Sequence, residues 1–230
     1  ADIVLLEKSL LVLNDGVAEG RRTFGNIVKY IKMGTSSAFG NMFSMLGASI
    51  LLPFLPMLPV QILLNNLLYD FSQTGIPFDH VDPEYLEKPR KWKVSEIRRF
   101  MVCIGPVSSL FDYATFALMW FVFKSNSVEA QGLFQTGWFV ESLMTQTLIV
   151  HIIRTAKIPF LQSRPSLAMA LVTVCVMGIG ILIPFTSVGS ALGMVPLPGL
   201  YFAWLAAILA GYCSLTQLIK SWFVGRYGYY

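Results

Sequence analysis

Charged residues are scarce in this chain of 230 residues. Asp, Glu, Lys and Arg together make up 13% of it, about half of the roughly 25% that is usual for a soluble domain. A soluble globule must cover its apolar interior with charge, so the composition argues against a soluble enzyme and a disordered tail. Cysteine is scarce as well. Cys103, Cys175 and Cys213 lie in apolar stretches and form no CxxC pair, so we expect small core side chains and no secreted disulfide scaffold.

Apolar sequence dominates instead. Hydrophobic residues make up 55% of the chain, and six apolar segments approach the roughly 20 residues that a helix needs to cross a bilayer core. These segments are residues 36–55, 58–76, 100–123, 134–153, 167–185 and 200–223. Pro53, Pro56 and Pro59 interrupt the first two, which predicts a tight hairpin turn. We therefore expect an all-α membrane protein with six transmembrane helices.

Basic residues lie between these segments. Of the 17 Lys and Arg, five precede the first segment, six lie between the second and third, three lie at the loop between the fourth and fifth, and two lie near the C-terminus. With six spans all of these positions face one side of the membrane, and only Lys124 faces the other. Because loops rich in Lys and Arg stay in the cytoplasm, both termini are predicted to be cytoplasmic. Basic residues spaced in this way do not indicate a nucleic-acid partner.

The N-terminal 35 residues have a different pattern. Residues 2–6 read as a short apolar strand, and no basic region precedes them as it would in a signal peptide. Residues 16–32 carry Phe24, Ile27, Val28 and Ile31 at amphipathic helical spacing. We expect a stalk helix (16–35) that continues into the transmembrane domain (36–230). Residues 1–15 are expected to belong to a cytoplasmic domain that is otherwise missing from this chain.

Three carboxylates fall inside the apolar segments: Asp70, Asp112 and Glu141. An ionised group at bilayer depth costs at least about 2.5–3.5 kcal/mol on insertion scales, so such residues indicate pairing or function. Asp112 has Ser108 and Thr115 on its helix face and no intramembrane Lys or Arg to pair with. A structural hydrogen bond or a protonated state explains Asp112 at least as well as ion contact does.

The second segment holds the clearest candidate for a cation site. Asn66 and Asp70 are four residues apart and therefore share a helix face. A carboxylate with an amide carbonyl suits Mg²⁺ or Ca²⁺ better than a soft metal. Ser37, Asn41 and Ser44 form a polar stripe on the first segment that could face them, and Glu141 could add a third side. Spacing alone leaves open an ion site or an interhelical polar contact, and for Ser37 and Ser44 it favours the contact.

Several motifs, in order along the chain, resemble the P-type cation ATPases. GVAEGRRTFGNIVKYIKMGTSS is similar to the end of their phosphorylation domain and their stalk. LPMLPVQILLNNLLYD is similar to their sixth transmembrane helix, and DPEYLEKPRKW to the loop that follows it. GPVSSLFDYATFALMWFVF and FQTGWFVESLMTQTLIVHIIRT resemble the bacterial magnesium-transporting subgroup, type IIIB. The resemblance covers essentially the whole chain.

The resemblance implies the last six of ten transmembrane helices, with a set of ion-binding residues. Asn66 and Asp70 match ion ligands of the family's sixth helix, Asn41 falls where calcium pumps place a ligand Glu, and Glu141 falls near their eighth-helix Glu. Asn in place of Glu at Asn41, and Tyr69 in place of a smaller ligand, fit one Mg²⁺ better than two Ca²⁺. The phosphorylation motif DKTGT and the dephosphorylation motif TGES do not occur in the chain.

We therefore expect a C-terminal fragment of an ATP-driven Mg²⁺ transporter of the bacterial inner membrane. Its partners would be membrane lipid and the missing N-terminal part of the same pump, where ATP and its Mg²⁺ would bind. The fragment alone should be unable to hydrolyse ATP. Two alternatives remain: a six-helix secondary cation transporter that works alone, which should show internal repeats, and a noncatalytic membrane subunit of another chain.

Overall fold

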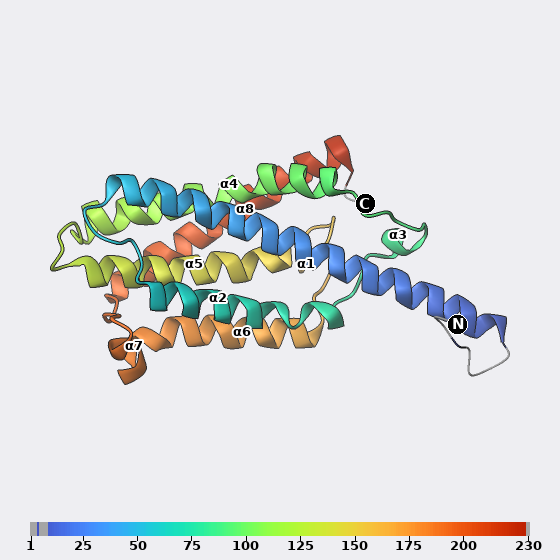
Figure 1. The fold of residues 1–230 in the computed structure, drawn as a ribbon, viewed down its shortest axis with the longest axis horizontal. Coiled ribbons are helices and arrows are strands. Elements are labelled where there is room, and N and C mark those ends of the chain that lie inside the picture. The colour runs from blue at the N-terminus through green and yellow to red at the C-terminus, as the bar shows by residue number, and fades with distance from the viewer. Residues whose placement is uncertain (1–3, 5–8, 229–230) are drawn as a thin grey trace.

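The computed structural model describes residue 4 and residues 9–228. These residues form helices and contain no β-strand (Figure 1). The predicted strand at residues 2–6 lies, except for Val4, outside the described part of the chain. The elements in order are α1 (Leu10–Leu51), α2 (Pro59–Gln73), the 3₁₀-helix η1 (Ile76–Phe78), α3 (Pro83–Leu86), α4 (Val94–Ala117), the π-helical turn η2 (Leu118–Val122), α5 (Gln131–Ile153), α6 (Leu167–Leu182), the 3₁₀-helix η3 (Ile183–Phe185), α7 (Ser187–Ala191) and α8 (Gly199–Tyr227).

α1 is a single helix of 42 residues that begins after Ser9. The Ser9 hydroxyl accepts a hydrogen bond from the backbone N–H of Leu11 at 3.2 Å, which satisfies one of the free donors at the helix start. The helix passes through Gly34 without a break, so residues 16–35 and most of the first apolar segment form one continuous helix, as predicted. In Figure 1 its N-terminal half projects beyond the other long helices, on the side where α3 lies. We call this side the α3 end.

The predicted hairpin turn is confirmed. α1 ends at Leu51 and α2 begins at Pro59, with Pro53 and Pro56 in the connection. Proline cannot donate a backbone hydrogen bond within a helix, but it fits the first helical position, where Pro59 stands. The turn returns the chain along α5, which contacts both α1 and α2, and residues of these two helices line two common cavities.

α5 is the central helix of the bundle. It contacts α1, α2, α4, α6 and α8, and 19 of its 23 residues are buried. Many of the buried residues are polar, including Gln135, Glu141 and Gln146. A polar side chain is tolerated at this depth when the surrounding helices, and not lipid, supply its contacts.

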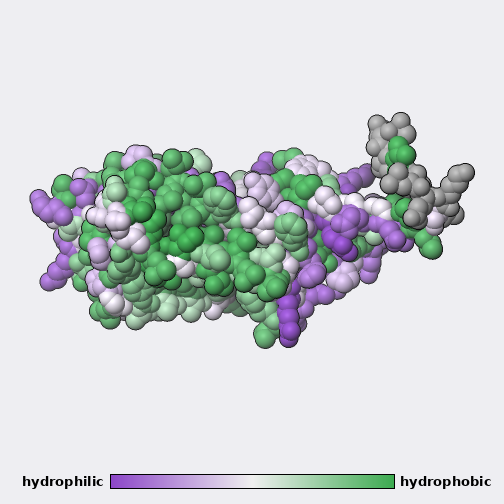
Figure 2. Space-filling view, turned by 90° about the horizontal axis from the view of Figure 1, so that it is seen from below, coloured by the Kyte–Doolittle hydropathy of each residue, from purple (hydrophilic) through white to green (hydrophobic). Residues whose placement is uncertain are grey.

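The prediction of six transmembrane helices is supported by length and composition for only three helices of the described chain. Residues Val94–Val122, Leu167–Phe185 and Gly199–Tyr227 are long and apolar enough to cross a membrane. α1, α2 and α5 cover the other three predicted segments. α2 has only 15 residues, and α5 carries its polar side chains inside the bundle. Figure 2 shows a broad apolar surface over the left-hand body of the molecule, with polar residues at its left edge and toward the α3 end.

Candidate functional site

A polar cavity lies between α1 and α2 toward the α3 end. It has a volume of about 450 Å³, and Asn41, Asn66 and Asp70 all line it. Asn41 is half-buried, whereas Asn66 and Asp70 are exposed in this chain. Three of the four predicted site residues therefore face one space from two helices. A carboxylate and two amides offer it the hard oxygen atoms that Mg²⁺ binds. We call this space the polar cavity.

A second, larger cavity adjoins the polar cavity. Its volume is about 670 Å³, and Asn41 and Asn66 line both spaces. Its other lining residues are mostly apolar side chains of α1 and α2, among them Met42 and Leu46. The polar cavity therefore continues along the α1–α2 hairpin into an apolar space.

Glu141, the fourth predicted residue, lines neither of these two cavities. Its side chain is completely buried in α5, and its carboxyl group lies within hydrogen-bonding reach of the carboxyl group of Asp112. Its charged neighbour is Asp112 of α4. Thr145, four residues further along α5, donates to the backbone carbonyl of Glu141 at 3.1 Å. The structure thus brings Glu141 to Asp112, and its role as an ion ligand stays a prediction.

Asp112 makes hydrogen bonds to two neighbouring helices. Its carboxylate accepts from Ser44 Oγ of α1 at 2.5 Å and from Trp138 Nε1 of α5 at 2.7 Å. A structural role is therefore sufficient to explain this residue. Ser44 turns toward α4 and away from the polar cavity, so its predicted part in an interhelical contact is confirmed.

Two residues of the site were missed by the sequence analysis. Gln146 of α5 lines the polar cavity, and its side-chain amide is close enough to donate to Asn41 Oδ1 at 3.5 Å and to Asn65 Oδ1 at 3.2 Å. Asn65 is 3% exposed and lies next to Asn66 on α2. The signal that could have found them is their polarity inside apolar segments, the signal that singled out Asp70.

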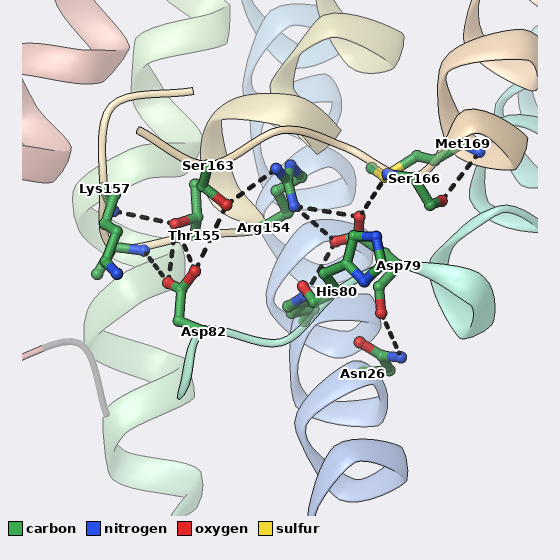
Figure 3. Close-up of polar contacts among 12 residues, drawn as sticks. Asn26, Asp79, His80, Asp82, Arg154, Thr155, Lys157, Ser163, Ser166 and Met169 are labelled. Atoms are coloured by element: carbon green, nitrogen blue, oxygen red, sulfur yellow. Dashed lines mark hydrogen bonds and ion pairs between the residues drawn. The ribbon is translucent and has the colours of Figure 1, made fainter. Parts of the chain in front are cut away.

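A buried ion-pair cluster lies at the α3 end, shown in Figure 3. Asp79, which follows η1, accepts from both Arg154 Nη1 at 2.9 Å and Lys29 Nζ at 3.0 Å. It also accepts from the backbone N–H of Ser166 at 3.2 Å. Burial lowers the pKa of Lys29, and the neighbouring Asp79 opposes that shift. The cluster therefore joins α1 to two connections, the one that follows α2 and the one that follows α5.

Asp82, three residues further on, holds the loop that follows α5. Its carboxylate accepts from Thr155 Oγ1 at 2.8 Å and from the backbone N–H of Ala156 at 3.1 Å (Figure 3). Lys220 of α8 approaches the same loop and donates to the carbonyl oxygens of Thr155 at 3.2 Å and Lys157 at 2.8 Å. The end of α5 is therefore fixed from two sides.

Comparison with known proteins gives consistent matches over the chain. Residues 54–222 match a family described as "Cation transporting ATPase, C-terminus". The chain is 58% identical over 229 residues to a "Magnesium-transporting ATPase, P-type 1" of Escherichia coli K12, covering 100% of this chain and 26% of that protein. It is 56% identical over 228 residues to the protein of the same name from Salmonella typhimurium LT2, covering 99% and 25%. The chain thus spans about a quarter of the length of these curated relatives.

Proposed function

Because this chain belongs to the family of cation-transporting P-type ATPases, we propose that it supplies part of the intramembrane cation site of an ATP-driven Mg²⁺ pump. The observation that carries the proposal is the polar cavity, in which Asp70 and Asn66 of α2 lie opposite Asn41 of α1. Mg²⁺ gives up its hydration water reluctantly and is often bound by one or two carboxylates with several waters retained. One carboxylate and two amide oxygens are therefore enough for a partly hydrated ion. Glu141 remains a further candidate ligand.

The cation reaches this site within a bundle that we propose crosses the bacterial inner membrane six times. The helices that would cross are α1, α2, α4, α5, α6 and α8. Both termini would be cytoplasmic, since 16 of the 17 Lys and Arg then share that side. Lipid would contact the apolar surface seen in Figure 2. Residues 1–15 would end the phosphorylation domain, 16–35 would form the stalk and 36–230 the transmembrane domain.

The main partner would be the rest of the same polypeptide. ATP and its Mg²⁺ would bind there, and a further transmembrane helix would cover the open side of the α1–α2 hairpin. Support for this comes from exposed apolar side chains on these two helices: Met42 and Leu46 of α1, which line the larger cavity, and Leu63 and Leu67 of α2. Large apolar side chains in such numbers mark a surface that meets lipid or another helix.

Movement of α1 offers a route from ATP hydrolysis to the cation. Phosphorylation in the N-terminal part would tilt or rotate the stalk, and α1 is one continuous helix from Leu10 to Leu51. Such a motion would carry Asn41 relative to Asn66 and Asp70. The Lys29–Asp79 ion pair, at 3.0 Å, joins the stalk to the segment that follows α2, so this segment would move together with the stalk.

Replacing Asp70 by Asn in the full-length pump tests the proposal. The substitution keeps the shape and removes the carboxylate, so ATP-driven Mg²⁺ flux across proteoliposomes should fall at least tenfold. Glu129→Gln serves as the control, because it removes an exposed carboxylate at the opposite end of the bundle and should leave the flux unchanged. If Asp70→Asn transported Mg²⁺ as well as the control, the site assignment would be wrong. The alternatives of a solitary secondary transporter or a noncatalytic subunit predict Mg²⁺ flux that does not depend on ATP bound by this polypeptide.

A further inference from the structure

Gln146 of α5 connects three helices at the inner wall of the polar cavity. Its Nε2 lies 2.6 Å from Ser142 Oγ of its own helix, 3.2 Å from Asn65 Oδ1 of α2 and 3.5 Å from Asn41 Oδ1 of α1. The side chain is 4% exposed and borders the polar cavity directly. No other amide in the described part of the chain has hydrogen bonds to side chains of both α1 and α2.

The number of hydrogens on this amide decides which contact is weakest. A Gln amide carries two N–H donors, and here it has three acceptors within reach. The contact to Asn41 is the longest, so Asn41 shares an N–H with a closer acceptor and its contact is the easiest to rearrange. Asn65 is also anchored to α5 by a second bond, from its Nδ2 to the carbonyl of Phe139 at 3.1 Å. The α2 side of the cavity is thus fixed, whereas the α1 side depends on Gln146.

The carbonyl oxygen of Asn41 can serve Gln146 and a cation at once. An amide oxygen has two lone pairs, so one can accept the Gln146 N–H while the other points into the cavity. Donors that hold a metal ligand in this way orient it, and their loss typically costs about tenfold to a hundredfold in metal affinity or activity.

We propose that Gln146 is a positioning residue of the cation site, which orients the Asn41 oxygen and thereby sets the affinity for Mg²⁺. This inference rests on the proposed function of the polar cavity. Gln146 need not touch the ion, since it acts through Asn41.

The test measures ATP-driven Mg²⁺ flux by the full-length pump at a fixed MgATP concentration. Gln146→Leu and Gln146→Met remove the amide while keeping a side chain of similar size, and Met is also unbranched like Gln. We expect each to raise KM for transported Mg²⁺ about tenfold, with kcat unchanged within about twofold. In an Asn41→Ala background, Gln146→Leu should raise KM by less than about threefold, because the residue through which it acts is gone.

Gln135→Leu is the matched control. Gln135 lies on the same helix, is 2% exposed and donates to a backbone carbonyl, that of Leu55, at 2.8 Å. It lines neither cavity of the α1–α2 hairpin, so its loss should leave KM unchanged.

An unchanged KM in both Gln146 variants would overturn the inference. So would a failure of both variants to fold, or a fall in kcat alone that matches Gln135→Leu, since either would show a purely structural role. The proposed function of the polar cavity is tested separately, by Asp70→Asn. If Asp70→Asn retains normal flux, the cation site itself is misplaced; if Asp70→Asn abolishes flux while the Gln146 variants keep a normal KM, only the positioning role is refuted.

Discussion

Asp79 is predicted to be the residue whose charge matters most for the stability of the α3 end. Its side chain and that of Arg154 are each 1% exposed, and the side chain of Lys29 is 8% exposed. Asp79→Asn would remove the carboxylate that pairs with both buried cations. Removal of one partner from a buried ion pair destabilises a protein by about 3–5 kcal/mol, because the remaining charge has lost its compensation. Partial compensation remains here, since Lys29 still donates to the carbonyl of His80 at 2.7 Å, so we expect the lower part of that range.

Chemical unfolding of the full-length protein in detergent, followed by far-UV circular dichroism, measures this loss. Glu84→Gln is the matched control, because Glu84 pairs with Lys157 at 2.8 Å in the same region, but with 51% and 36% of the two side chains exposed. Exposed ion pairs contribute little, so this variant should unfold as the unmodified protein does. Combining Asp79→Asn with Arg154→Met should recover part of the loss, since no unpaired guanidinium then remains. The reasoning is refuted if Asp79→Asn and Glu84→Gln behave alike.

Two further predictions concern α1. A Cβ at Gly40 would overlap Ser108 of α4 and lie 2.7 Å from the Gly105 carbonyl oxygen, so Gly40→Ala should lower the free energy of unfolding by about 1–3 kcal/mol. A Cβ at Gly34 meets nothing within 4 Å, so Gly34→Ala should instead stabilise the helix by about 0.5–1 kcal/mol. Equal effects of the two substitutions on the free energy of unfolding would contradict the packing argument. Burial lowers the pKa of Lys32 from 10.5 to about 8, so between those pH values the unfolded chain binds a proton that the folded chain lacks. The free energy of unfolding should then rise by up to about 1.4 kcal/mol per pH unit in this range. The same titration of Lys32→Met should lack this rise.

The sequence by itself determined the family and the class of fold. Apolar segments of membrane length, prolines between the first two and basic residues between the others predicted the long helices and the hairpin, because each signal is local. The choice of Asp70 and Asn66 was equally local, since residues four apart on a helix must share a face. The structure places both residues along one cavity with Asn41, and their role as cation ligands stays a prediction.

Tertiary structure alone decided which polar residues meet. Glu141 carries no mark in the sequence that directs it to Asp112, and Gln146 carries none that directs it to Asn41 and Asn65. These pairings depend on how α5 is rotated within the bundle, and that rotation is set by packing against five other helices. The same reason explains why polar α5 lies at the centre. A helix covered by its neighbours needs no apolar surface toward lipid, so its own hydropathy does not report its depth.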